Sequence, residues 1–139
     1  MTESSLKNPK LIQLGQIGNS SLGYITVGES YINVPFDIKR TYWTYFTPHN
    51  VERGGHAHKK LKQVIVAVSG IIEIKLENLE GEVFKFVLDS PDQGLLIEST
   101  CWREIKFSHS AILLCLASDL YSQEDYIRNY NEFKKLTNG

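Results

Sequence analysis

The stretch Arg53-Gly-Gly-His-Ala-His-Lys-Lys-Leu-Lys-Gln-Val-Ile-Val-Ala-Val-Ser-Gly70 decides how the rest of the chain is interpreted. His56 and His58 stand one residue apart. Alternate side chains of an extended strand leave the same face, so both imidazoles should point into one cavity. Two glycines before them permit a tight entry into the strand. A five-residue apolar run and a Ser-Gly turn signal follow. The stretch therefore predicts a histidine-bearing strand, an apolar strand and a functional site on the first of them.

Chain length and net charge limit the number of domains and the kinds of partner that the protein can have. The chain has 139 residues, a common size for one domain, and we expect a single domain over residues 1–139. Fifteen basic and sixteen acidic residues give a net charge of −1, so no overall field favours nucleic acid or an anionic membrane. The first ten residues lack the apolar core of a signal peptide, and the longest apolar run, 111–117, is too short to span a bilayer. These features predict a cytoplasmic protein with no nucleic-acid or membrane partner.

Short strand signals at intervals of roughly ten residues dominate the chain, a spacing typical of an all-β sandwich or barrel. Besides the two strands of the opening stretch, we expect strands over residues 11–14, 23–27, 38–46, 71–77, 83–88, 95–97, 102–107 and 111–116. The end of the chain differs, because Tyr126, Tyr130 and Phe133 recur at helical spacing. A short helical or turn segment over 123–133 should therefore pack on the barrel, and packing is the expected role of these three aromatic residues.

A β-barrel with His-x-His on an early strand invites comparison with the cupins. In their first motif an acid follows the second histidine after three or four residues, and a glycine comes six residues later. Here Gln63 takes the place of the acid and Gly70 that of the glycine. The second cupin motif normally adds a histidine where this chain has Arg103. Two imidazoles, an amide and a permanent cation make a poor transition-metal site. We expect no metal, which leaves the histidines free for proton chemistry.

Several separated motifs resemble one family more closely. They are the opening stretch, Pro35-Phe-Asp-Ile-Lys-Arg-Thr-Tyr, Trp102-Arg-Glu and Leu116-Ala-Ser-Asp-Leu-Tyr followed by Asp125-Tyr-Ile-Arg-Asn-Tyr. Together they resemble the dTDP-4-keto-6-deoxyglucose 3,4-ketoisomerases, the WxcM-like sugar isomerases of the cupin superfamily. The resemblance implies a jelly-roll barrel, a homodimer, no metal or other cofactor, and a dTDP-linked 4-keto-6-deoxy hexose that is converted to its 3-keto isomer. The product would supply a 3-amino-3,6-dideoxy sugar of a surface glycan.

This reaction needs a group that takes a proton from C3 and one that delivers a proton to C4. Histidine titrates near neutrality and suits both steps. We expect one of His56 and His58 to carry the proton, with His58 preferred, and the other to orient the sugar and polarise its oxygens. Arginine is a poor acid, so Arg103 should not supply the second proton. The proton would then return from the base that removed it, which favours a gluco-type 4-hydroxyl in the product.

The diphosphate of such a substrate needs cations. Arg40, Arg53 and Lys60 are the candidates, because guanidinium and ammonium groups suit phosphate oxygens. Tyr42 shares a strand face with Arg40 and could reach the sugar or a phosphate. We also place Gln63 and Arg103 among the substrate-binding residues. The thymine should stack on an aromatic ring, and the sequence leaves four open: Tyr42, Trp43, Tyr45 and Trp102.

Three alternative functions are compatible with parts of this pattern. A dTDP-sugar 3,5-epimerase would use the same barrel, but it usually needs a tyrosine acid opposite a His–Asp pair, and the sequence offers no clear aspartate partner for either histidine. A non-enzymatic sugar-nucleotide-binding cupin would need the cations but not the paired imidazoles. A metal-dependent dioxygenase is disfavoured by Gln63 and Arg103.

Overall fold

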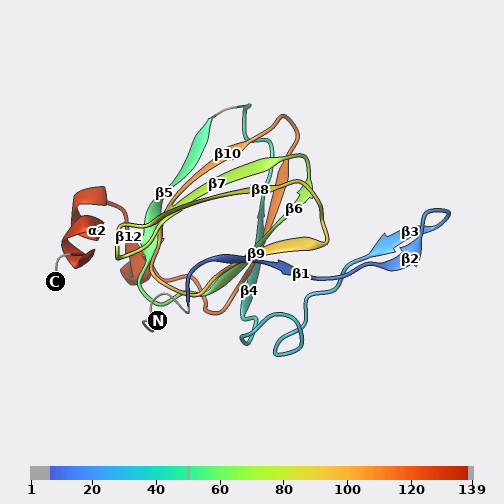
Figure 1. Ribbon diagram of the computed structural model, residues 1–139, viewed down its shortest axis with the longest axis horizontal. Coiled ribbons are helices and arrows are strands. Elements are labelled where there is room, and N and C mark those ends of the chain that lie inside the picture. Colours follow the sequence, from blue (N-terminus) through green and yellow to red (C-terminus); the bar gives the residue numbers. More distant parts are fainter. Residues whose placement is uncertain (1–6, 50, 138–139) are drawn as a thin grey trace.

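The computed structural model describes residues 7–49 and 51–137. Two five-stranded antiparallel sheets face each other (Figure 1), with the orders β1-β9-β6-β11-β4 and β12-β5-β10-β7-β8. The strands of the first sheet are β1 (Lys10–Gln13), β9 (Gln93–Ile97), β6 (Gln63–Ser69), β11 (Ile112–Ala117) and β4 (Arg40–Thr44). Those of the second are β12 (Tyr126–Ile127), β5 (Glu52–His58), β10 (Trp102–Phe107), β7 (Ile72–Glu77) and β8 (Val83–Leu88). The predicted all-β jelly-roll class is confirmed.

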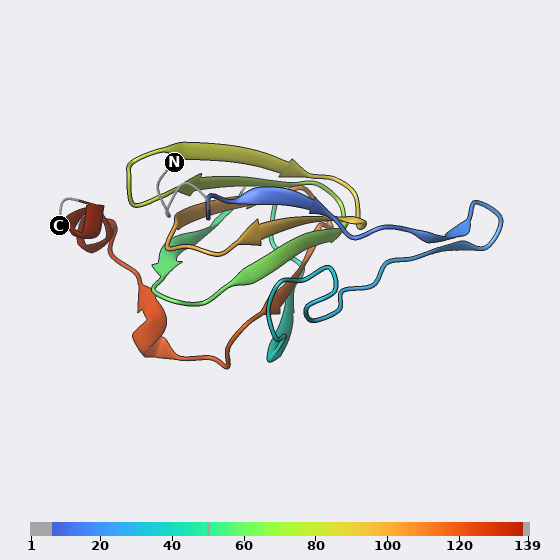
Figure 2. The same ribbon diagram turned by 60° about the horizontal axis from the view of Figure 1, so that its bottom comes forward.

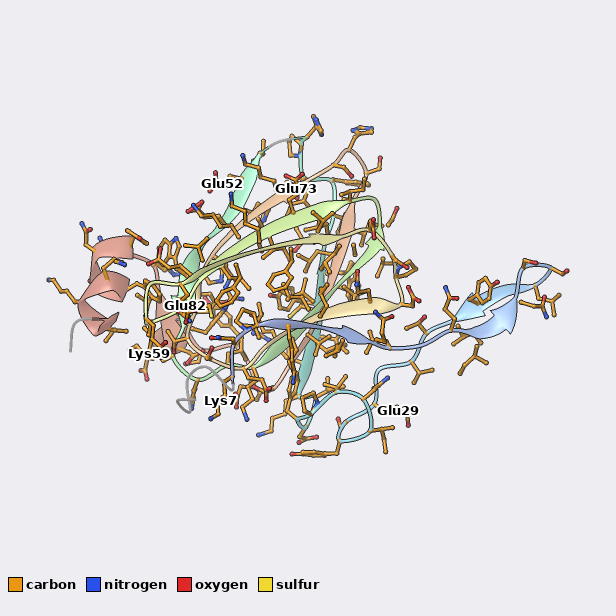
Figure 3. All side chains as sticks on the ribbon, viewed as in Figure 1. Lys7, Glu29, Glu52, Lys59, Glu73 and Glu82 are labelled. Atoms are coloured by element: carbon orange, nitrogen blue, oxygen red, sulfur yellow. The ribbon has the colours of Figure 1, made fainter. Side chains whose placement is uncertain are left out.

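The burial of each strand follows from its sequence. The apolar run in β6 is buried from Gln63 to Ala67, because the first sheet is covered on both faces. One face packs against the second sheet, and the other carries the segment with Val34 and Phe36. In contrast, β7 alternates buried and exposed residues, because only its inner face is covered. Outward-facing charges such as Glu52 and Glu73 stand on the solvent side of the second sheet (Figure 3).

The main core lies between the sheets and leaves one region less filled. Apolar side chains of β6, β7, β9, β10 and β11 form the core cluster. Toward β4 and β5 the facing side chains are polar or cationic, and a cavity opens there. The core therefore holds β4 and β5 in place, and the inner faces of these two strands carry polar and cationic side chains of the cavity.

A thin hairpin leaves the body of the molecule near the end of β1. It consists of β2 (Ile17–Asn19) and β3 (Gly23–Ile25), which pair from Ile17↔Ile25 to Asn19↔Gly23. Both views show it extending away from the two sheets (Figures 1 and 2). We call β2 and β3 with their turn the arm. Its first strand is one that the sequence had not predicted, because a Gly-Asn-Ser-Ser loop signal overlaps its end.

The C-terminal segment is correctly predicted as partly helical, but its details differ from the expectation. A 3-10 turn η1 (Gln123–Asp125) precedes β12, and the α-helix α2 starts later and covers Tyr130–Thr137. Tyr126 pairs with His58 in the β12–β5 ladder, so it cannot share a helical face with Phe133. Phe133 is fully buried against Trp102, as expected for a packing residue. Among the described residues, no helix is both long and apolar enough to cross a membrane.

Candidate active site

The two histidines lie at the end of β5 that faces the cavity. Their ring centroids are 4.9 Å apart, so strand alternation places both imidazoles on one face as predicted. His56 lines the cavity, whereas the His58 side chain is only 2% exposed. Gly54 lets β5 approach β10 closely at φ +92°, where a Cβ atom would meet the Arg103 carbonyl oxygen at 2.8 Å. This glycine fixes the distance between the histidine strand and the strand of Arg103.

Hydrogen bonds fix the tautomers of both imidazoles. Nδ1 of His58 lies 3.2 Å from Oδ2 of Asp125, and Nδ1 of His56 lies 3.1 Å from the Gly54 carbonyl oxygen. A carboxylate and a carbonyl oxygen can only accept, so both Nδ1 atoms carry the proton. Each Nε2 therefore holds a free lone pair. Asp125 is itself held in place, because its Oδ1 accepts from the Lys60 backbone N–H at 2.9 Å.

The imidazoles are neutral bases at neutral pH. Burial, followed by the Arg103 guanidinium, lowers the pKa of His56 to about 4. The same two causes lower the pKa of His58 well below its usual range, with His56, Arg40 and Arg128 adding to the effect.

Cations dominate the wall of the cavity, which has a volume of about 310 Å³. It contains four guanidinium groups, those of Arg40, Arg53, Arg103 and Arg128. Two of these side chains carry buried N–H groups without a partner, Nε of Arg40 and both Nε and Nη2 of Arg103. Buried donors rarely remain unpaired. Four guanidinium groups around a cavity of ligand size suit a group that is anionic or rich in oxygen atoms.

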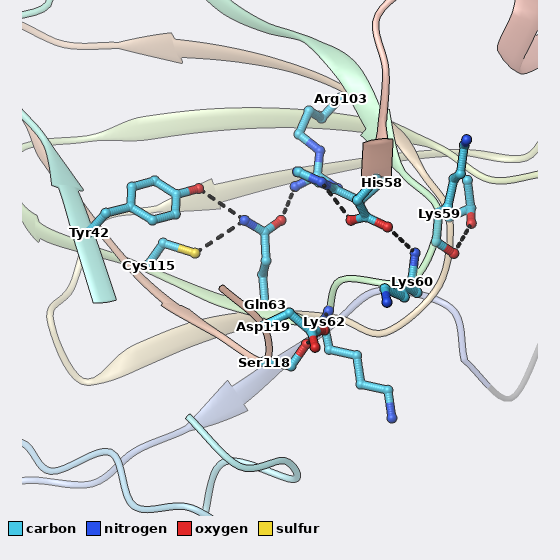
Figure 4. A network of polar contacts seen from close by, with 12 residues as sticks. Tyr42, His58, Lys59, Lys60, Lys62, Gln63, Arg103, Cys115, Ser118 and Asp119 are labelled. Carbon is cyan, nitrogen blue, oxygen red and sulfur yellow. Dashed lines mark hydrogen bonds and ion pairs between the residues drawn. The ribbon is translucent and has the colours of Figure 1, made fainter. Parts of the chain in front are cut away.

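A buried network lies behind Arg103 (Figure 4). Nη1 of Arg103 donates to Oε1 of Gln63. Nε2 of Gln63 in turn donates to Tyr42 Oη at 2.9 Å and to Cys115 Sγ at 3.2 Å. Burial raises the pKa of the Tyr42 phenol, which stays protonated at neutral pH. The two positions at which cupins carry a metal-binding acid and histidine are thus hydrogen-bonded to each other.

Four of the six predicted substrate-binding residues line the cavity: Arg40, Tyr42, Arg53 and Arg103. Gln63 lies behind the wall, 1% exposed, and contacts Arg103 instead of the open space. Lys60 follows the end of β5, so strand alternation no longer applies to it. Its side chain lines hollows beside Asp119, outside this cavity.

Only one of the four aromatic candidates for the thymine lines the cavity in the described chain. That residue is Tyr42. Trp43 and Tyr45 belong to the opposite, exposed face of the chain around β4. Trp102 packs against Tyr130 and Phe133 in a separate cluster.

Sequence reasoning missed three residues of this site, all after β11. Asp125 contacts His58, and the Tyr126 ring lies 4.4 Å from the His58 ring and 5.1 Å from the His56 ring. The Arg128 guanidinium covers the Tyr126 ring at 4.1 Å. The prediction that Tyr126 has only a packing role is wrong in this respect, because Tyr126 and Arg128 both line the cavity. The motif 125–130 contained all three residues, but only its polarity could have suggested a role in the site.

Comparison with known proteins places this geometry among sugar-nucleotide isomerases. The family described as FdtA: WxcM-like, C-terminal matches residues 7–138. The TDP-4-oxo-6-deoxy-alpha-D-glucose-3,4-oxoisomerase of Aneurinibacillus thermoaerophilus is 39% identical over 128 residues, which cover 91% of this chain and 90% of that protein. The TDP-quinovose 3,4-ketoisomerase WlaRB of Campylobacter jejuni is 44% identical with a TM-score of 0.86, and the match covers 93% of this chain and 98% of WlaRB.

Another solved relative was crystallised with a sugar nucleotide. A mutant of the 3,4-ketoisomerase QdtA from Thermoanaerobacterium thermosaccharolyticum, in complex with TDP-4-keto-6-deoxyglucose, is 37% identical with a TM-score of 0.87. The match covers 92% of each chain. A dTDP-4-dehydrorhamnose 3,5-epimerase from Bacillus anthracis is only 16% identical at a TM-score of 0.73 and therefore shares the fold alone.

Proposed function

Because the chain belongs to the WxcM-like, C-terminal family (FdtA), we propose that it is a dTDP-4-keto-6-deoxyglucose 3,4-ketoisomerase. It would convert the 4-keto sugar to a dTDP-linked 3-keto-6-deoxy hexose. The paired imidazoles carry this proposal: His56 lines a cavity surrounded by guanidinium groups, and the ring of His58 lies directly beside it. The neutral bases suit proton transfer, and the cations suit both the diphosphate and the negative charge that develops on the sugar.

The reaction moves one hydrogen between carbon atoms and one between oxygen atoms. A base removes the proton from C3, and the electrons form an enediolate across C3 and C4. Return of that proton to C4 leaves the carbonyl at C3, while O3 loses a proton and O4 gains one. Every bond that breaks has a matching bond that forms, so no redox partner is required.

His58 is the proposed base, because Asp125 orients its ring and stabilises the imidazolium that forms when it takes the C3 proton. His56 borders the open space and is proposed to carry the proton between O3 and O4. Arg103 lines the cavity as a cation and would stabilise the enediolate. Arg103 remains a poor acid, so the C4 proton returns from His58 on the face from which it was removed. H3 and H4 lie on opposite faces of a gluco-type ring, so this one-base route gives a galacto-type product. The expectation of a gluco-type 4-hydroxyl is corrected accordingly.

The remaining cavity residues are proposed to hold the nucleotide. Arg40, Arg53 and Arg128 are placed to neutralise the diphosphate, and Tyr42 or Tyr126 offers an aromatic face. We further propose a homodimer, because the arm exposes apolar side chains that a single chain leaves uncovered, including Ile17 and Ile25, both 63% exposed. The cytoplasmic location and the supply of an amino sugar for a surface glycan remain predictions.

Proton NMR of dTDP-4-keto-6-deoxyglucose with the protein in deuterated buffer, without added metal, tests the function. The expected result is a 3-keto sugar whose coupling pattern identifies the C4 epimer. A gluco-type product would contradict the one-base route, because it needs a second acid on the opposite face of the sugar, while preserving the isomerase. Binding of the sugar nucleotide without any turnover would leave only a binding protein.

The 3,5-epimerase is the second candidate. The structure corrects one argument against it, since His58 does have an aspartate partner in Asp125. Identities of 37–44% to the ketoisomerases nevertheless favour isomerisation over epimerisation. Deuterium entering at C3 and C5 without migration of the carbonyl would decide for the epimerase.

A further inference from the structure

We propose that Gln63 is a positioning residue that holds the Arg103 guanidinium in the cavity wall without neutralising its charge, and that an amide at this position is required for that role. The inference rests on the proposed function and adds to it a residue that touches neither the substrate nor the imidazoles.

Both N–H groups and the oxygen of the Gln63 amide have hydrogen-bond partners, so the amide can adopt only one orientation. Its two N–H groups donate to Tyr42 Oη and Cys115 Sγ, and its oxygen accepts from Arg103. Rotating the amide by half a turn would set its NH₂ group against the Arg103 donor, which is unfavourable. Burial at 1% exposure excludes water as a substitute partner. The anchors Tyr42 and Cys115 thus determine where Arg103 points.

An amide and a carboxylate would have opposite electrostatic effects at this position. Glutamate has the same shape as glutamine and would accept the same hydrogen bond from Arg103, but it would form a buried ion pair. The charge that Arg103 offers to the cavity would then be largely cancelled. The amide accepts from one guanidinium N–H and leaves the net charge of Arg103 intact.

The pKa values of His56 and His58 depend on the charge of Arg103. The Arg103 guanidinium is the largest cause, after burial, that lowers the pKa of both His56 and His58. A carboxylate at position 63 would remove that effect and add an attraction for the protonated rings. The other charged or titratable groups near the rings are Arg53 on β5, Arg40 and Tyr42 on β4, and Asp125, Tyr126 and Arg128 around β12. Of these groups only Tyr42 contacts position 63, and its hydroxyl would donate to the glutamate instead of accepting from the amide.

The test is a titration of ¹⁵N-labelled histidines by NMR in the wild type and in Gln63→Glu, with exposed His49 and His109 as internal references. We expect Gln63→Glu to raise the pKa of both site imidazoles by about one unit or more. Gln13→Glu is the matched control, because it makes the same change on exposed β1 and should leave the imidazoles unaffected. Wild-type pKa values in folded Gln63→Glu would overturn the proposal.

Gln63→Met is a second test, which can be used even if Gln63→Glu does not fold. Methionine keeps the volume and leaves the charge of Arg103 in place, but it cannot accept a hydrogen bond. Hydrogen exchange of the Arg103 guanidinium N–H groups should become faster, and kcat should fall about ten-fold with a smaller change in KM. Wild-type exchange in this variant would refute the positioning role. A wild type without turnover would refute the proposed function alone, because neither NMR measurement needs a substrate.

Discussion

At the scale of single residues, the imidazole of His58 can act as a base only if its proton lies on Nδ1 and Nε2 is unprotonated. Asp125→Asn tests this point, because an amide nitrogen facing Nδ1 would force the proton to Nε2 and abolish the free lone pair. The asparagine oxygen can still accept from the Lys60 backbone N–H, so the fold should survive. We expect kcat to fall about 10²-fold with little change in KM, measured by steady-state assay of the 3-keto product.

Asp119→Asn is the matched control for that substitution. Asp119 lies nearby and accepts from Ser118 Oγ at 2.9 Å, but it does not line the catalytic cavity. Wild-type activity is expected for this variant. Equal losses in the two variants would indicate a general effect on the loop and contradict the specific role of Asp125.

The lowered pKa values of the histidines also affect stability. A histidine whose pKa is lowered in the folded state binds fewer protons than in the unfolded chain, so protonation favours unfolding. For His56 this window runs from its ordinary value of about 6.5 down to about 4. The free energy of unfolding in urea should therefore fall between pH 6.5 and pH 4.5. The double variant His56→Asn/His58→Asn should show a shallower decline, and an equal slope in both proteins would contradict the assignment.

The residues of the site differ in how visible they are in the sequence. His56 and His58 could be predicted to share a face, because alternation along one strand is a local property. Asp125 could not be assigned, because its contact with His58 joins positions 67 residues apart and depends on the path of the chain after β11. Lys60 shows the limit of the local rule, since β5 ends at His58 and the next side chains leave its face.

At the scale of elements, strand limits were predicted to within one residue for β1, β7, β8, β10 and β11. The strands β8 and β10 begin and end as expected over 83–88 and 102–107. The C-terminal helix was placed too early, because the spacing of Tyr126, Tyr130 and Phe133 also fits a strand followed by a helix. Residues 126–127 form a strand because β12 pairs with β5, and that pairing is a tertiary contact that the local sequence does not reveal.

The close approach of β5 to β10 is a property of elements that one substitution can test. Gly54→Ala places a Cβ atom 2.8 Å from the Arg103 carbonyl oxygen, in a backbone region that L side chains rarely adopt. The strands must separate, so we expect a drop in Tm together with a large loss of activity. Gly55→Ala is the control, since it also has positive φ, at +63°, but meets no atom within 4 Å. Equal Tm values and activities for the two variants would show that strand spacing does not matter.

At the scale of the whole molecule, the arm is an unusual part of the structure. Its two strands have three residues each, and an isolated two-stranded hairpin is marginally stable in water. Ile17, Tyr24 and Ile25 nevertheless expose more than half of their surface. The body also carries an apolar hollow near the base of the arm, lined in part by Leu14 and Leu116. Such paired apolar surfaces are what two copies of one chain would cover by exchanging arms.

The proposed homodimer therefore depends on the arm, and charged residues introduced into the arm should dissociate the dimer into monomers. We expect Ile17→Lys/Ile25→Lys to be monomeric in sedimentation velocity, where the wild type should be dimeric, because lysines cannot be buried unpaired in an apolar interface. Val83→Lys/Val87→Lys makes the same change at two half-exposed positions of β8 and should remain dimeric. A dimeric arm variant would place the interface elsewhere. A monomeric variant that still turns over the sugar would show that one chain holds a complete site, whereas loss of activity in a folded monomer would mean that the partner completes the cavity.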